Sequence, residues 1–410
     1  AIIIPVFILD CWKASIVVLL TERMVQPMDK PTVQDIFHRF YPAYLDQYSP
    51  SPVQAKVAHN IMNCKTGAYG ANVCVCEDCG FVQIHYNSFR NRCCPMCQAV
   101  PKEMWMDARR EDVLDAPYFH LVFTVPDILN PVIYSNQRLL YDALYHAASS
   151  TISELTADPK RLGAKVGYIC ILHTWGSEMN FHPHIHTILL GGGLASNNQW
   201  KDNGENFFLP IRVISKVFRG KYLEELKRLW EEDKLVFHGT AEKFRNHYTF
   251  KELLDSCYGM DWIPHCKKTF NGAQTVMKYL GKYTHRIAVS NHRIVRMDDD
   301  TVTFLVKDYR NEGQWKELTI SGVEFVRRFL MHVPPRRFVR IRHYGLLCFR
   351  TKNQKLTLCR NLLGCKKYLS KLRDMEMPEI LEHLYGIKVC VCKACGGHLG
   401  KPQMRMPLRC

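Results

Sequence analysis

The chain has 410 residues, 47% of them hydrophobic, which is enough apolar material for a large core spread over two or three domains. It carries 55 lysines and arginines against 39 acidic residues, and this net charge of +16, spread along the chain, favours a folded protein that binds a polyanion over a disordered basic tail. Its 18 cysteines include several C-x-x-C pairs, which favours metal thiolates in a reducing compartment over a disulfide framework.

The apolar segment 1–28 does not fit the pattern of the rest of the chain. It contains Asp10 and Lys13, lacks a basic leading region, and does not begin with methionine. A membrane anchor is the weaker alternative, and we interpret residues 1–28 as upstream or non-native sequence. The expected location is the cytoplasm, in association with the nucleoid, with no membrane partner.

Hydrophobic periodicity predicts a mixture of helices and strands from residue 29 onward. Helices are expected over 29–70, 103–116, 135–156, 219–235, 272–286 and 325–333, and strands over 118–125, 165–176, 181–190 and 301–309. A short turn separates the strands 165–176 and 181–190, so we expect them to form an antiparallel hairpin.

Two C-x-x-C pairs lie within a cysteine-dense module at residues 73–98. Their spacing, with fourteen residues between Cys79 and Cys94, is typical of a closed tetrahedral Zn²⁺ site with a structural role. The predicted ligands are Cys76, Cys79, Cys94 and Cys97. Arg90 and Arg92 lie between the two pairs and are candidates for contacts with DNA phosphates.

A further pair, Cys392 and Cys395, precedes Cys410 by the same fourteen-residue gap. We interpret this end of the chain as a second zinc knuckle that has been cut short, with a metal-free two-cysteine turn as the alternative.

Three histidines alternate along the predicted strand 181–190. Residues two apart on a strand share one face, so the imidazoles of His184 and His186 can converge on one divalent cation. Two protein ligands leave positions open for a substrate oxygen, as a catalytic metal requires. The third ligand stays open among His182, Glu178 and His285.

A pair of tyrosines is spaced for one face of the predicted helix 272–286. Tyr279 and Tyr283 are four residues apart, and a tyrosine hydroxyl can act as a covalent nucleophile, although such pairs more often pack in a core. Cations on the same segment would attract a phosphodiester. These are Lys278, Lys282 and Arg286, and two arginines of a later basic run, Arg340 and Arg342, are further DNA-binding candidates.

These motifs, in this order, resemble the rolling-circle transposases of the HUH nuclease superfamily, in particular the family founded on insertion sequence ninety-one and its common-region relatives. The resemblance spans about residues 30–365 and depends on "CEDCGFVQIHYNSFRNRCCPMCQ", "FHLVFTVPDILNP", "ILHTWG", "HPHIHTILLGGGL", "KYLGKYTHRIAVSNHRI", "VTFLVKDYR" and "FVRIRHYGLL". This chain departs from the family pattern at two positions: relatives usually carry a cysteine where this chain has Phe89 and a histidine where it has Cys93. We therefore expect zinc binding to use the other four cysteines, or Cys93 in place of one of them.

The resemblance implies an α+β fold in which an antiparallel sheet with flanking helices carries His184 and His186 opposite the helix with Tyr279 and Tyr283. It implies Mg²⁺ or Mn²⁺ at the histidines, attack by a tyrosine on single-stranded DNA at the element ends and target, and a 5′-phosphotyrosine product. The implied domains are a helical and zinc-binding module (29–110), an HUH catalytic domain (111–320) and a basic C-terminal region (321–410). Homo-oligomerisation is compatible with this arrangement.

Three other functions fit parts of the pattern. A plasmid replication initiator or relaxase shares the tyrosine chemistry, and a histidine-triad nucleotide hydrolase shares the alternating histidines, although Pro183 and the net charge argue against it. The third is a non-catalytic zinc DNA-binding protein, including a decayed copy of a mobile element.

Overall fold

The computed structural model describes residues 30–203, 209–262, 264–270, 281, 288–308 and 313–405. The α-helices are α3 (Val33–Gln47), α4 (Pro52–Met62), α5 (Ala99–Arg110), α6 (Asn130–Ser135), α7 (Gln137–Ala157), α8 (Ile211–Glu231), α9 (His247–Gly259), α11 (Gly322–Met331), α12 (Lys352–Leu363) and α13 (Met377–Tyr385). The strands are β1 (Ala71–Val75), β2 (Val82–Tyr86), β3 (Tyr118–Thr124), β4 (Lys165–Trp175), β5 (Phe181–Leu194), β6 (Trp200–Asp202), β7 (His265–Phe270), β8 (Ile294–Met297), β9 (Thr301–Asp308), β10 (Gln314–Ser321), β11 (Ile341–Gly345) and β12 (Gln403–Arg405).

An antiparallel sheet forms the centre of the molecule, so the predicted α+β class is confirmed. Its strand order is β11-β4-β5-β3-β7, with β6 added beside β5, and each neighbouring pair is antiparallel. The predicted hairpin is present as β4 and β5. Two smaller sheets, β12-β1-β2 and β10-β9-β8, lie outside this one.

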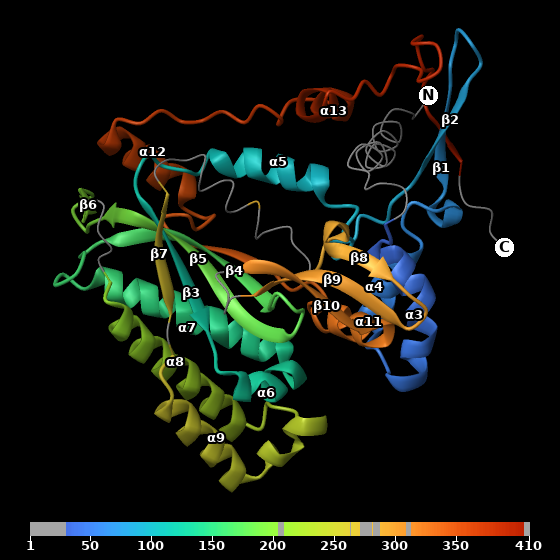
Figure 1. Cartoon of the computed structure of the whole chain (residues 1–410). Coiled ribbons are helices and arrows are strands. Elements are labelled where there is room, and N and C mark those ends of the chain that lie inside the picture. The colour runs from blue at the N-terminus through green and yellow to red at the C-terminus, as the bar shows by residue number, and fades with distance from the viewer. Residues whose placement is uncertain are drawn as a thin grey trace, which may run out of the picture.

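The two faces of the central sheet are covered differently (Figure 1). Because side chains alternate along each strand, Phe119, Leu121 and Phe123 of β3 point to one face, where they join the large core built with α7 and α8. Tyr118 belongs to a separate cluster on the other face, which includes Trp105 and Met106 of α5. Helices α5 and α12 therefore cover part of that second face.

A second core joins segments that are far apart in the sequence. Helices α3 and α4 pack with α11 and with strands β8 and β9, through side chains such as Phe37, Phe329 and Phe304. Phe37 and Phe329 meet edge to face with their ring centroids 5.2 Å apart.

This core differs from the predicted domain boundaries. The expected division between residues 320 and 321 falls within β10, next to α11 of the second core. Helices α3 and α4, from the module expected at 29–110, belong to the same core. In addition, β11 of the expected C-terminal region pairs with β4 in the central sheet. Periodicity reports local structure only, so these long-range pairings carry no signal in it.

The short elements beyond residue 333 were not predicted. The basic run around residue 340 forms β11, where Arg342 pairs with Cys170 of β4.

Within the described ranges no helix is both long enough and apolar enough to cross a bilayer.

Candidate metal centre

Cross-strand pairing brings three histidines together on the second face of the central sheet. His184 lies opposite His173 of β4 and opposite Thr124 of β3. Because alternate residues share a face, His186 follows His184 on the same side. One nitrogen from each of His173, His184 and His186 lies within 4.8 Å of the others, and all three residues are buried.

Pro183 does not interrupt the strand that carries these histidines. The register between β4 and β5 shifts between His173 and Trp175, which pair with His184 and Phe181. On the other side, Thr124, which pairs with His184, is the last residue of β3. Pro183 therefore occupies an irregular position where the ladder does not require its missing N–H group.

Hydrogen bonds select the nitrogen that each imidazole offers. His184 Nδ1 lies 2.7 Å from the carbonyl oxygen of His182 and must donate to it, so the lone pair of His184 is on Nε2. His186 Nδ1 lies 2.9 Å from His120 Nε2 and shares a hydrogen bond with it. The nitrogen of His186 that faces His184 is therefore Nε2, and a partner on the opposite ring nitrogen is what orients metal-binding histidines.

The spacing of these nitrogens fits a bound cation. His184 Nε2 and His186 Nε2 are 3.0 Å apart. A divalent ion binds imidazole nitrogens at about 2.0–2.1 Å, which separates two such ligands by about 3 Å. Burial lowers the pKa of His184 to about 4, so this imidazole is neutral at pH 7, as a ligand must be.

Two of the residues predicted as candidates for the third metal ligand, His182 and Glu178, lie outside the histidine cluster. His182 is partly exposed, and its Nδ1 lies 3.1 Å from Asp127 Oδ1, outside the cluster. Glu178 is not in the cluster either, and its backbone carbonyl accepts a hydrogen bond from Arg328. His173 is the third member of the cluster. It lies in "ILHTWG", three residues from the turn of the hairpin that also carries His184, and no local pattern in the sequence places it opposite His184.

The predicted nucleophiles lie outside the described residues, as do the basic side chains around them. These residues are Tyr279, Tyr283, Lys278, Lys282, His285 and Arg286. Gly281 is described and is buried. A Cβ built on Gly281 would collide with Met106 Sδ and would lie 3.2 Å from Lys102 Cε, so Gly281 lies against α5.

The predicted four-cysteine zinc site is wrong in its combination of ligands. Cys76 and Cys79 lie with Cys392 and Cys395, whereas Cys94 and Cys97 lie with Cys64. The spacing within each pair was informative, but spacing alone cannot tell which pairs meet. Cys410, expected to complete the C-terminal knuckle, lies outside the described residues.

The buried group of Cys64, Cys94 and Cys97 offers three sulfur ligands. Cys64 Sγ is 3.2 Å from Cys97 Sγ and 3.6 Å from Cys94 Sγ. Hydrogen bonds from Cys64 and Cys94 lower the pKa of Cys97, which favours its thiolate. Cys93 is not among these ligands and is buried in the core around α3 and α11.

The four described arginines that were predicted to bind DNA differ in their exposure and in their contacts within the protein. Arg90 and Arg92 are exposed, and Arg92 also donates to the carbonyl of Phe338. Arg342 forms an ion pair with Asp142 and stacks over Tyr145 at 4.0 Å, and Arg340 lies over Trp175 at 5.8 Å. The last two arginines therefore have internal packing roles.

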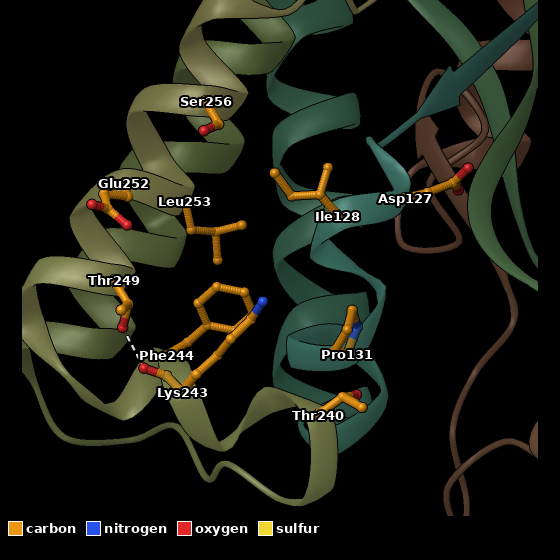
Figure 2. Close-up of a pocket in the computed structure, with 10 residues that line it drawn as sticks. All are labelled: Asp127, Ile128, Pro131, Thr240, Lys243, Phe244, Thr249, Glu252, Leu253 and Ser256. Carbon is orange, nitrogen blue, oxygen red and sulfur yellow. Dashed lines mark hydrogen bonds between the residues drawn. The ribbon is translucent and has the colours of Figure 1, made fainter.

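A cavity of about 430 Å³ lies away from the histidines. It is lined by side chains from the α6 and α9 regions, including Pro131, Phe244 and Leu253 (Figure 2). Asp127 lies at its edge, with its carboxylate hydrogen-bonded to His182. The cavity holds none of the clustered histidines.

Comparison with known proteins now identifies the family. A family model described as a transposase zinc-binding domain matches residues 36–125, and one described as a putative transposase matches residues 167–355. The putative transposase y4qJ of Sinorhizobium fredii (strain NBRC 101917 / NGR234) is 39% identical over 369 residues, covering 89% of this chain and 93% of that protein. This chain belongs to the insertion sequence ninety-one family of transposases.

A second member of the family supports this assignment. The transposase for insertion sequence element IS801 of Pseudomonas savastanoi pv. phaseolicola is 30% identical over 309 residues, covering 74% of this chain and 72% of that protein.

Two solved structures show weak similarity. Both are the conjugative relaxase TrwC in complex with oriT DNA, one metal-free and one copper-bound. The metal-free structure matches at a TM-score of 0.22 and 16% identity, over 44% of this chain and 67% of the relaxase. The copper-bound structure matches at 0.24 and 14% identity, over 62% of this chain and 95% of the relaxase.

Proposed function

We propose that this transposase nicks and transfers single-stranded DNA by a metal-dependent tyrosine reaction at the face of the central sheet that carries His173, His184 and His186. The observation that supports this most strongly is the convergence of buried imidazole nitrogens, with the Nε2 atoms of His184 and His186 3.0 Å apart. This convergence of buried imidazoles from two neighbouring strands is the arrangement that a divalent ion bound by histidines requires.

The histidines supply the metal site. His173, His184 and His186 would hold a Mg²⁺ or Mn²⁺ ion, which would polarise a phosphate oxygen at the scissile bond. His120 and the carbonyl of His182 hold the two histidines of β5 in orientation through their second ring nitrogens. These contacts fix the ligand nitrogens before DNA binds.

A tyrosine supplies the nucleophile. The hydroxyl oxygen of Tyr279 or Tyr283 forms a bond to the scissile phosphorus, and the 3′ oxygen of the preceding nucleotide leaves and takes up a proton. The products are a 5′-phosphotyrosine and a free 3′-hydroxyl. When a 3′-hydroxyl attacks that phosphotyrosine, the strand is rejoined and the tyrosine is released, so transfer needs no external energy source.

Gly281 supports the place of the tyrosines in this scheme. It is two residues from both Tyr279 and Tyr283, and it lies against α5, which covers the face of the sheet where the histidines cluster. Gly281, which lies between the two tyrosines in the sequence, therefore contacts the helix that covers this face.

Variants of the proposed metal ligands should lose DNA cleavage and keep DNA binding. With Mn²⁺ and labelled single-stranded oligonucleotides from the DNA that flanks the element, we expect His184→Ala and His186→Ala to abolish cleavage. Binding should stay within about twofold of wild type, because lysines and arginines that contact phosphates carry the affinity. If binding falls as much as cleavage, the histidines have a structural role and the proposal fails.

A further inference from the structure

Two C-x-x-C-G segments from opposite ends of the chain fold in the same way. The N–H of Gly80 donates to the carbonyl of Cys76 at 3.1 Å, and the N–H of Gly396 donates to the carbonyl of Cys392 at 3.0 Å. Both glycines have a positive φ, +69° at Gly80 and +78° at Gly396, which other residues rarely adopt. Such a turn directs both thiols of a C-x-x-C pair to one point.

The sulfur atoms of the two segments face each other. Cys76 Sγ lies 3.5 Å from Cys395 Sγ, and Cys79 Sγ lies 3.8 Å from Cys392 Sγ. Tetrahedral zinc with Zn–S bonds of about 2.3 Å separates its sulfur ligands by about 3.8 Å. A disulfide would need about 2.05 Å, so the spacing fits a shared cation better than two disulfides.

Backbone pairing holds the two segments together. Strand β12 pairs with β1, and Figure 1 shows the segment after α13 reaching β1 and β2. The N–H of Glu77 donates to the carbonyl of His398 at 3.0 Å, and the N–H of Gly400 donates to the carbonyl of Val75 at 2.9 Å. The cysteines therefore meet as part of one small sheet rather than through a chance approach of two loops.

We propose that Cys76, Cys79, Cys392 and Cys395 bind one Zn²⁺ ion that joins the two ends of the described chain. The site is formed by two distant segments, since Cys79 and Cys392 are 313 positions apart in the sequence. It differs from the site expected within residues 76–97, and it does not depend on the proposed nuclease chemistry. Its ligand set is closed, so its role is to anchor the C-terminal segment to the β1–β2 hairpin.

Zinc stoichiometry of paired variants of the full-length chain tests this proposal. The variants are Cys76→Ser/Cys79→Ser, Cys392→Ser/Cys395→Ser and the combined quadruple variant, with Cys348→Ser, an exposed thiol outside the clusters, as the matched control. Each double variant should lose about one zinc per molecule, and the quadruple variant should lose no more than either double variant. Losses that add in the quadruple variant would show two separate sites and overturn the proposal.

Alkylation of the wild-type protein gives a test that does not depend on the folding of variants. Cys79, Cys395 and Cys348 are all exposed. Of these three thiols, we expect Cys348 alone to react with iodoacetamide in the zinc-loaded protein, and Cys79 and Cys395 to become reactive after a chelator is added. Reaction of Cys395 without a chelator would contradict the shared site, and so would protection that only a reductant removes, which would indicate disulfides.

Discussion

At the scale of single residues, the third imidazole is the finding that the sequence pattern could not supply. The alternation in "HPHIH" predicts that His184 and His186 share a face, and the structure places them so. The alternation gives no information on the partner strand, because the residue opposite His184 depends on the register of the hairpin. That register places His173 in the cluster and leaves His182 at the edge.

Substitution of His173 and of His182 should show which of the two histidines is the third metal ligand. We expect His173→Ala to reduce Mn²⁺-dependent cleavage about 100-fold, since loss of a ligand or its support typically lowers metal affinity or activity by about 10- to 100-fold. His182→Ala is the matched control on the same hairpin and should keep cleavage within about threefold of wild type. Mn²⁺ titration of both variants provides the measurement, and a larger effect at His182 would reverse the assignment.

His332 links the hairpin to α11 and should make stability depend on pH. Its Nε2 donates to the carbonyl of Met179 at 3.0 Å, and its Nδ1 accepts from Thr174 Oγ1 at 3.1 Å, so the ring is neutral in the folded protein. Burial lowers the pKa of His332 to about 4. The unfolded chain, with a histidine pKa of about 6.5, therefore binds a proton first as the pH falls.

The contribution of His332 should be lost between about pH 6.5 and pH 4 and should be constant above pH 7. A shift of about 2.5 pKa units corresponds to an upper bound of about 3 kcal/mol. Chemical denaturation at pH 7 and pH 5 should show a smaller loss of unfolding free energy in His332→Gln than in wild type. The exposed His292→Gln serves as the control, and an equal pH dependence in all three proteins would show that His332 does not titrate on unfolding.

At the scale of elements, the sequence predicted the parts of the site that are local. Helix α7 and strands β3, β4, β5 and β9 lie where periodicity placed them, and the hairpin of β4 and β5 follows from its short turn. Strand β11 was missed because "IRHYG" has no alternation of apolar and polar residues, and it is a strand because β4 offers it an edge. Between the two tyrosines in the sequence, Gly281 lies against α5.

Packing between Gly281 and α5 should affect cleavage without affecting the histidine cluster. Gly281→Val places branched carbons where Met106 Sδ lies, so we expect a loss of cleavage of about 10-fold or more, because small displacements of a nucleophile are costly. Shortening the opposing side chain with Met106→Ala should restore part of the rate in the double variant. Loss of cleavage in Gly281→Val without any rescue would argue against this contact.

At the scale of the whole molecule, described segments far apart in the sequence pack together, so the two smaller units are not continuous stretches of the chain. Helices α3 and α4 share a core with α11, and β12 pairs with β1. The composition predicted enough apolar residues for such cores, and the cysteine spacing predicted zinc-type knuckles. Contacts between distant segments decide which cysteine pairs meet and which core a helix joins. Local sequence motifs carry no information on these contacts.

The most direct test of the proposed function is the location of the covalent DNA adduct. Wild-type protein with Mn²⁺ and single-stranded DNA from the element end should give a denaturant-resistant adduct, and mass spectrometry of the digested adduct should place it on Tyr279 or Tyr283. Tyr→Phe substitution at the modified position should remove or move the adduct, and His184→Ala should abolish it. An adduct on a histidine, or no adduct with active DNA cleavage, would contradict the tyrosine mechanism.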